Sequence, residues 1–345
     1  VESYSVTYED EEFDEKNEIL EITNIKAKTW HEIKLDNKVE LENKLTQIIA
    51  INDEPLATST WFSHFIALEK IKTFGYDLIF GGLGGDEFNA GEYEYFTFFF
   101  ADIIKNGQNF DQEVGFWEKY HNHKIYKKNK SVALENLKNF VDFNVPGKCL
   151  IDKTRVTKYV DCIQTENFAQ KNYEDQLFCP FESYLNNRTY QDLFYETLPC
   201  CLRAQDRNGN FFGLHTVNPF LQKDIAEFMF SIPHSLKIKK GVTKFLLREA
   251  TKETLPETTR NRITKVGWNA PAHLWFTGKN LDFVRDELNS KNFKNLGLYN
   301  IKNTNKIIDD HLKIIKKKSI KENHMMFLWQ LTNILIWSKT ANIRL

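Results

Sequence analysis

The sequence predicts an α/β protein with a parallel sheet near its start and a largely helical second half. Short β-prone segments at residues 5–8, 29–35 and 76–80 alternate with amphipathic segments in the first part of the chain. This alternation is typical of parallel sheets whose strands are joined by covering helices. After Gly91 the spacing of apolar residues is mostly helical, which indicates a second half built from helices.

Composition narrows the classes of function. The chain has 345 residues, of which 41% are hydrophobic, so a sizeable core is available. Its 46 Lys and Arg residues balance 47 Asp and Glu residues, and nothing in this charge indicates a nucleic-acid or membrane-surface partner. No apolar stretch is as long as a membrane span. We therefore expect a cytoplasmic protein with no nucleic-acid partner and no membrane partner.

The five cysteines are sparse and show no Cys-x-x-Cys spacing. This predicts reduced thiols rather than a disulfide framework or a metal site. The neighbours Cys200 and Cys201 are expected to pack in the core.

Helical spacing of apolar residues predicts the remaining elements. Residues 96–104 are almost all apolar and include three consecutive phenylalanines, which favours a buried helix over a cofactor-contacting segment. The other expected helices lie at residues 17–25, 39–51, 61–73, 111–120, 131–143, 151–165, 172–187, 303–318 and 323–337.

A glycine-rich loop follows the segment 76–80, which reads as a buried strand. Residues 81–85 include four glycines, and Asp86 and Glu87 come directly after them. Glycines let the backbone approach a ligand closely, and a glycine loop after a strand is a common phosphate cradle. Carboxylates beside phosphates require a cation between them, which points to a nucleotide with Mg²⁺. A tight strand-to-helix turn, with both acids in the first turn of the helix, explains this stretch equally well.

Further motifs occur in a fixed order around this loop. They are DEP at 53–55, GGLGGDE at 81–87, GEY at 91–93, LPCCLRAQDR at 198–207, GLHTVNPFL at 213–221, GVTK at 241–244, LREA at 247–250, LP at 255–256 and RITKVGW at 262–268. In this order the motifs resemble the synthetase domain of the glutamine-hydrolysing asparagine synthetase family. The resemblance implies the fold of the pyrophosphate-loop ATPases, which is of the adenine nucleotide alpha hydrolase-like type. It covers residues 1–345 as one synthetase domain, with a nucleotide-binding α/β part at 1–100 and a mainly helical part at 101–345.

The resemblance also implies a reaction. In the family, ATP activates a substrate carboxylate as an acyl-adenylate, and ammonia or another amine then attacks it. Gly81, Gly82 and Gly84 would bind the nucleotide through the loop backbone, and Val6 would line the adenine. Lys265 could reach a phosphate, although a surface lysine is an equally good interpretation. The implied partners are ATP, Mg²⁺, a small carboxylate, ammonia or an amine donor, and a glutaminase domain or subunit.

Three charged residues receive the chemical roles. By the resemblance Asp86 would bind Mg²⁺, Lys244 would stabilise the charge that develops during acyl transfer, and Glu87 is a catalytic candidate. Lys244 precedes the probable helix 245–253, where a cation opposes the helix dipole unless an anion lies nearby. A solvated surface lysine is the alternative interpretation.

Two acidic motifs stay open at this stage. Asp53 and Glu54 fit either the family motif or a simple turn before Pro55. Asp206 and Arg207 fit either a buried structural ion pair or the floor of an active site.

The chain also departs from the family pattern. The family's Ser-Gly-Gly-x-Asp-Ser pyrophosphate loop would precede residues 5–8, so the resemblance implies an N-terminally incomplete domain that also lacks the glutaminase domain. Leu83 replaces a family glutamate, and His215, Val217 and Gln222 replace charged residues. Leucine cannot accept a proton. The competing hypothesis is therefore a degenerate, non-catalytic relative that acts as a binding or scaffold protein.

Overall fold

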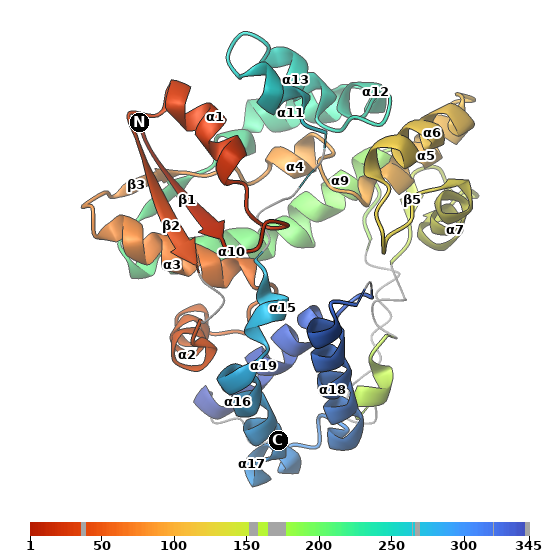
Figure 1. The fold of residues 1–345 in the computed structure, drawn as a ribbon. Coiled ribbons are helices and arrows are strands. Elements are labelled where there is room, and N and C mark those ends of the chain that lie inside the picture. The colour runs from red at the N-terminus through yellow and green to blue at the C-terminus, as the bar shows by residue number, and fades with distance from the viewer. Residues whose placement is uncertain are drawn as a thin grey trace.

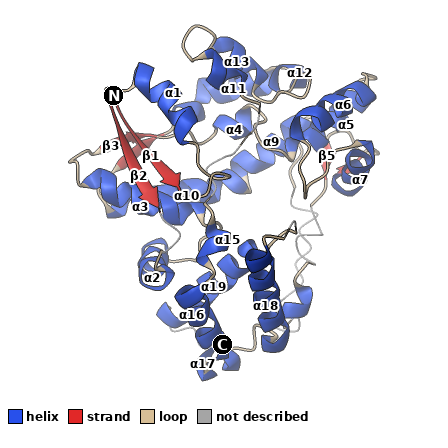
Figure 2. Cartoon of the chain, viewed as in Figure 1, coloured by secondary structure: helices blue, strands red, loops and turns tan. Residues whose placement is uncertain are grey.

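The structure is a computed structural model that describes residues 1–35, 39–151, 158–164, 177–263, 265, 270–319 and 321–341. Helices dominate it, with a few short strands between them (Figure 2). The strands are β1 (Glu2–Tyr8), β2 (Thr29–Leu35), β3 (Leu78–Phe80), β4 (Val141–Asp142), β5 (Lys148–Cys149) and β6 (His215–Val217).

The first helices follow the strands closely. They are α1 (Lys16–Lys26), α2 (Leu41–Asn52), α3 (Thr60–Lys72), α4 (Gly85–Phe88), α5 (Tyr95–Lys105), α6 (Phe110–His121), α7 (Lys130–Phe140), the 3₁₀ helix η1 (Val160–Cys162), α9 (Tyr184–Phe194) and α10 (Thr197–Phe211). The later ones are η4 (Pro219–Leu221), α11 (Lys223–Ser231), α12 (His234–Lys237), α13 (Phe245–Ala250), α14 (Glu257–Asn261), α15 (Ala272–Trp275), α16 (Gly278–Asn289), α17 (Lys291–Asn295), α18 (Ile301–Lys317) and α19 (Met325–Thr340).

The described strands form three separate pairs. β1 pairs with β2 in parallel, from Glu2 opposite Thr29 to Tyr8 opposite Leu35. β3 pairs in parallel with β6, although β6 lies more than a hundred residues further along the chain, and β4 pairs with β5 in antiparallel fashion. The predicted parallel pairing is therefore present, but as separate pairs in the described part of the chain.

The strand expected at residues 76–80 is shorter than predicted, and the expectation that it is buried is wrong. β3 has only three residues, and Leu78 and Phe80 expose 53% and 67% of their surface. Only Ile79 points to the other face, where it packs with Leu68, Ile71 and Leu214. The strand has one face on α3 and one face uncovered, and an uninterrupted apolar run cannot reveal this difference.

Two large apolar cores hold the helices. The larger one joins α2 and α3 to the C-terminal helices α16, α18 and α19, and includes Leu45, Phe62, Trp275 and Trp329. The second joins α5, α6, α7 and α9. The predicted buried helix at 96–104 is confirmed as α5, because its three consecutive phenylalanines all lie in this second core.

Most helix predictions agree with the structure, and the differences have local causes. The helix expected at 131–143 ends at Phe140, because the next two residues pair with Lys148 and Cys149. The segments 152–157 and 165–176, which carry much of two predicted helices, lie outside the described residues. Helix α9 begins only at Tyr184.

All five cysteines have free thiols, as predicted. Core packing of the neighbouring pair is wrong for Cys200, which is exposed on α10, while Cys201 is half-buried. Among the described helices, none combines the length and the apolar character that crossing a membrane requires.

The arrangement places one short helix at the centre. In Figure 1, α4 lies between the β1–β2 pair, the helices α11 to α13 and the helices α5 and α6. The C-terminal helices α16 to α19 lie at the opposite end of the molecule from α11 to α13 (Figure 1). Helix α4 directly follows the glycine loop, so the candidate site lies where these parts meet.

Candidate functional site

The glycine loop connects β3 to α4 by a turn that demands glycine at one position. Gly81 donates its N–H to the carbonyl of Val217 at 2.8 Å, which continues the β3–β6 pairing by one residue. Gly84 has φ +88°, and a Cβ there would overlap the side chain of Leu221. Gly82 has open space around its Cα, so the loop backbone is accessible at this point.

Four charged residues meet beside this loop, and we call them the lysine cluster: Asp86, Glu92, Lys244 and Lys265. Lys244 Nζ contacts Asp86 Oδ1, and Lys265 Nζ lies 3.0 Å from Asp86 Oδ2. Lys265 Nζ also contacts Glu92. All four side chains keep between 22% and 40% of their surface exposed, so solvent or a ligand can reach them.

The backbone is shaped to allow these contacts. A Cβ on Gly91 would overlap both Asp86 Oδ1 and Lys244 Cε, so this position must be glycine for the pair to form. Lys244 itself adopts the left-handed conformation, with φ +56°, directly before α13. Its N–H donates to the carbonyl of Asn89 at 3.1 Å, which ties this turn to the segment after α4.

Lys265 is fixed by a neighbouring tyrosine. The hydroxyl of Tyr93 donates to the carbonyl of Lys265 at 2.7 Å and accepts from its N–H at 3.1 Å. The tyrosine therefore holds the backbone of Lys265 in a position from which its ammonium reaches both Asp86 and Glu92.

The electrostatics follow from burial and these pairs. Burial works to raise the pKa of Asp86, but the two lysines outweigh it and hold the pKa below its usual range. Burial works to lower the pKa of Lys265, and the carboxylates of Asp86 and Glu92 raise it instead. For Glu92 burial prevails, and its pKa lies above its usual range despite Lys265.

Glu87 is placed differently from its neighbour. It is only 8% exposed, and the contacts of the lysine cluster do not include it. Burial, together with the nearby charge of Asp86, raises the pKa of Glu87 to about 6. A carboxyl group with this pKa can gain or lose a proton close to neutral pH.

The structure thus brings Asp86, Lys244 and Lys265 together, as the sequence predicted for each of them separately. Val6 lies on β1 and packs against the larger core. The sequence analysis missed Glu92, although it lies inside the motif at 91–93. The signal that could have identified it is the second acid following Asp86 within one short segment.

The residues that depart from the family pattern lie apart from this cluster. Leu83 is half-buried and packs against two apolar cores, so it serves packing here. His215 and Val217 lie on the exposed face of β6, opposite Leu78 and Phe80 in register, and Gln222 is also exposed.

The two open acidic motifs are resolved locally. Asp53 ends α2 in the left-handed conformation, and Glu54 forms an ion pair with Arg203 at 2.7 Å. Asp206 is exposed, while Arg207 donates to the carbonyl of Ile51 at 3.3 Å. The buried ion pair between Asp206 and Arg207 is therefore absent.

A divalent cation fits this arrangement. Asp86 and Glu92 both contact the ammonium of Lys265, so two carboxylates already converge on the position of one positive charge. Mg²⁺ is commonly bound by one or two carboxylates together with substrate phosphates. The described residues contain no group of three or more His, Cys, Asp or Glu side chains for a metal held by protein alone.

Together, the paired parallel strands, the glycine loop and the balanced charges define a mixed α/β protein with a candidate site for a phosphorylated ligand. Comparison with known proteins then gives the family. The family model for asparagine synthase matches residues 1–339, and the chain belongs to this family.

A curated relative agrees with this assignment. The chain is similar to asparagine synthetase [glutamine-hydrolyzing] 1 of Bacillus subtilis (strain 168), with 28% identity over 142 residues. The alignment covers 41% of this chain and 22% of the relative, so the chain matches about a fifth of that protein's length. The family relation indicates a ligase-type enzyme that forms an amide with ATP.

Proposed function

We propose that this chain is the synthetase part of an ATP-dependent ligase that activates a carboxylate as an acyl-adenylate and transfers it to an amine, on a fold of the pyrophosphate-loop ATPase type. The observation that carries the proposal is the lysine cluster, in which Lys244 and Lys265 share Asp86 beside the glycine loop. Two cations whose counterions can be taken over by Mg²⁺ are suited to a polyanionic substrate.

The reaction has two steps. A carboxylate oxygen attacks the α-phosphorus of ATP, and the bond to the leaving pyrophosphate breaks. The amine nitrogen then attacks the acyl carbon, the C–O bond to AMP breaks, and the amine loses a proton as the amide forms. Both steps move negative charge among phosphate oxygens, and fixed cations lower the barrier to such a transfer.

The side chains have distinct roles in this proposal. Asp86 and Glu92 would hold Mg²⁺, which when bound neutralises phosphate charge. The carboxylates then no longer occupy Lys244 and Lys265, whose ammonium groups turn to the phosphates and the leaving group. Glu87, with its raised pKa, is the candidate to accept the amine proton.

The remaining residues would position the nucleotide. The backbone of Gly81, Gly82 and Gly84 faces the phosphates in this proposal, because the loop joins a parallel strand to the helix that carries Asp86. Val6 lies on the neighbouring strand pair, where it would line the adenine.

The test is isotope exchange between pyrophosphate and ATP, measured on the natural full-length protein with a panel of carboxylates. Carboxylate-dependent exchange is expected, and it should require Mg²⁺. The absence of exchange with every carboxylate, in protein that binds Mg-ATP, would overturn the adenylation chemistry.

A second candidate function is a non-catalytic binding protein. The observation that favours it is Leu83, which packs into two cores at the position where the family carries an acid. Calorimetric titration with Mg-ATP separates the two candidates. A ligase binds Mg-ATP, whereas a degenerate relative whose lysine cluster is purely structural does not.

A further inference from the structure

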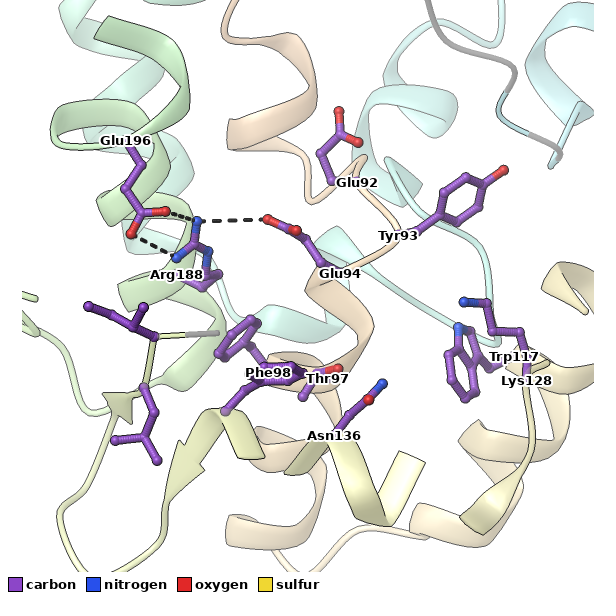
Figure 3. Close-up of a pocket in the computed structure, with 13 residues that line it drawn as sticks. Glu92, Tyr93, Glu94, Thr97, Phe98, Trp117, Lys128, Asn136, Arg188 and Glu196 are labelled. Atoms are coloured by element: carbon purple, nitrogen blue, oxygen red, sulfur yellow. Dashed lines mark hydrogen bonds and ion pairs between the residues drawn. The ribbon is translucent and has the colours of Figure 1, made fainter. Parts of the chain in front are cut away.

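A separate pocket lies next to the lysine cluster, within the helical part formed by α5, α6, α7 and α9 (Figure 3). Its volume is about 550 Å³, which is within the usual range for small-molecule sites. Glu92 and Tyr93 belong both to its wall and to the surroundings of Lys265. The pocket therefore adjoins the proposed site of acyl transfer.

One end of the pocket offers hydrogen-bond donors without acceptors. Lys128 Nζ lies 5.1 Å from the centre of the Trp117 ring, and no carboxylate contacts this lysine within the described part of the chain. Burial lowers the pKa of Lys128, which shows that its charge is partly desolvated. Trp117 Nε1 is buried without a hydrogen-bond partner among the described atoms. Asn136 of α7 lies beside them (Figure 3).

The opposite end is acidic. We call its four residues the arginine cluster: Glu94, Arg188, Asp192 and Glu196. Arg188 contacts Asp192, lies 2.5 Å from Glu196 and 3.7 Å from Glu94, so three carboxylates share one guanidinium. Figure 3 shows this end across the pocket from Lys128 and Trp117. Such an excess of carboxylates favours an ammonium group on a ligand.

The surface between the two ends is apolar. It is formed by Phe98, Phe140, Leu150 and Ile151, and Phe98 is only 5% exposed. A ligand that joins the two polar ends therefore needs an apolar body. Unsatisfied buried donors are costly, and a ligand carboxylate at Lys128 and Trp117 would satisfy both of them.

We propose that this pocket binds an amino acid with an apolar side chain, its carboxylate at Lys128 and Trp117 and its ammonium group at Glu94 and Glu196. Binding stands on the pocket alone. The further role of this ligand as the acceptor amine rests on the proposed ligase function.

In that role the ammonium group first loses one proton to a pocket carboxylate. The free amine then forms the C–N bond while the C–O bond to AMP breaks, and AMP leaves with the bonding electrons. The second amine proton passes to solvent.

The test is calorimetric titration of the full-length protein with three probes. They are L-phenylalanine, 3-phenylpropanoate, which lacks the amine, and 2-phenylethylamine, which lacks the carboxylate. L-phenylalanine is expected to bind, and each of the other two to bind about tenfold more weakly, because each loses one charged contact.

Two variants locate the binding. Lys128→Gln should weaken L-phenylalanine and 3-phenylpropanoate about tenfold and leave 2-phenylethylamine unchanged. Lys124→Gln, in the same connecting segment but exposed, is the matched control and should change nothing. Trp117→Phe keeps an aromatic ring and removes the donor, so it should weaken the same two probes to a smaller degree.

The outcomes separate this pocket from the ligase proposal. Mg-ATP is titrated into the same samples. Amino-acid binding without Mg-ATP binding retains the pocket and overturns the ligase, and the reverse result overturns the pocket alone. Equal effects of Lys128→Gln and Lys124→Gln, or no binding of L-phenylalanine, would also overturn the pocket.

Discussion

The lysine cluster and the arginine cluster meet along one short segment, since Glu92 contacts Lys265 and Glu94 contacts Arg188. They are built in opposite ways. The lysine cluster balances two ammonium groups against two carboxylates, and its side chains are 22% to 40% exposed. The arginine cluster holds three carboxylates around one guanidinium, with Arg188 only 11% and Asp192 only 2% exposed.

The difference teaches which charges are available to a ligand. Asp192 is additionally held by the hydroxyls of Tyr95 at 2.7 Å and Thr197 at 3.0 Å. A buried charge with several fixed partners cannot exchange them without a large cost in free energy. A half-exposed cluster of flexible lysines can exchange its partners, so we assign stability to the arginine cluster and chemistry to the lysine cluster.

The largest expected effect is on the arginine cluster. Arg188→Met leaves buried carboxylates without their cation, and it should lower the free energy of unfolding by about 3–5 kcal/mol. Urea unfolding measures this loss. Arg188→Lys keeps a charge but not the forked geometry, and should lose less. A change in Arg188→Met below about 1 kcal/mol, the usual value of a surface pair, would break the comparison.

The next effect concerns the rate of the reaction. Lys244→Met should slow carboxylate-dependent ATP–pyrophosphate exchange by about 10²–10³, the usual cost of losing one group that stabilises developing charge. Its unfolding free energy should stay within about 1 kcal/mol, because the pair with Asp86 is partly solvated. Lys252→Met, exposed just beyond α13, serves as the control. A large loss of stability with exchange intact would reverse the assignment.

A smaller effect tests the backbone that allows the lysine cluster to form. Gly91→Ala places a methyl group against Asp86 and Lys244, and should cost about 1–3 kcal/mol through overpacking. Gly115→Ala, in α6 with open space around it, should instead stabilise by about 0.5–1 kcal/mol. Thermal unfolding of the two variants checks both signs. Similar shifts in the two would show that the contact at Gly91 is unimportant.

The smallest effect per step concerns a buried cation outside both clusters. Lys237 is 1% exposed, its ammonium donates to Asn186 Oδ1 at 2.9 Å, and burial lowers its pKa to about 7 despite the charge of Asp102. Between that value and the ordinary 10.5 the unfolded chain binds more protons than the folded one.

Stability should therefore rise with pH from about 7 towards 10.5, by at most about 1.4 kcal/mol per pH unit, and the full cost of the charge is present below pH 7. Urea unfolding at several pH values measures this slope, and Lys237→Met should flatten it. An equal slope in that variant would show that other groups cause it.

Local patterns explain what the sequence could predict. The glycine loop with Asp86, the lysine before α13 and the apolar helix α5 each depend on neighbouring residues, and all three are found in place. The contact of Lys265 with Glu92 joins residues 173 positions apart, and no periodicity reports such a distance.

The errors have a similar origin. A run of apolar residues indicates a strand but not how many of its faces are covered, so Leu78 and Phe80 were expected to be buried. Adjacent charges at 206 and 207 suggested an ion pair, yet successive residues on a helix do not face each other. Asp206 is accordingly exposed on α10.

The left-handed backbone of Lys244 carries a record of selection. A residue other than glycine costs about 1 kcal/mol or more in this conformation, and asparagine or glycine tolerates it more readily. In a lineage that no longer needs the ammonium group, drift would replace the lysine with one of these cheaper residues. The residue found at this position in each relative therefore reports whether that lineage still uses the charge, and a set of relatives can be sorted into active and silent members by this one column.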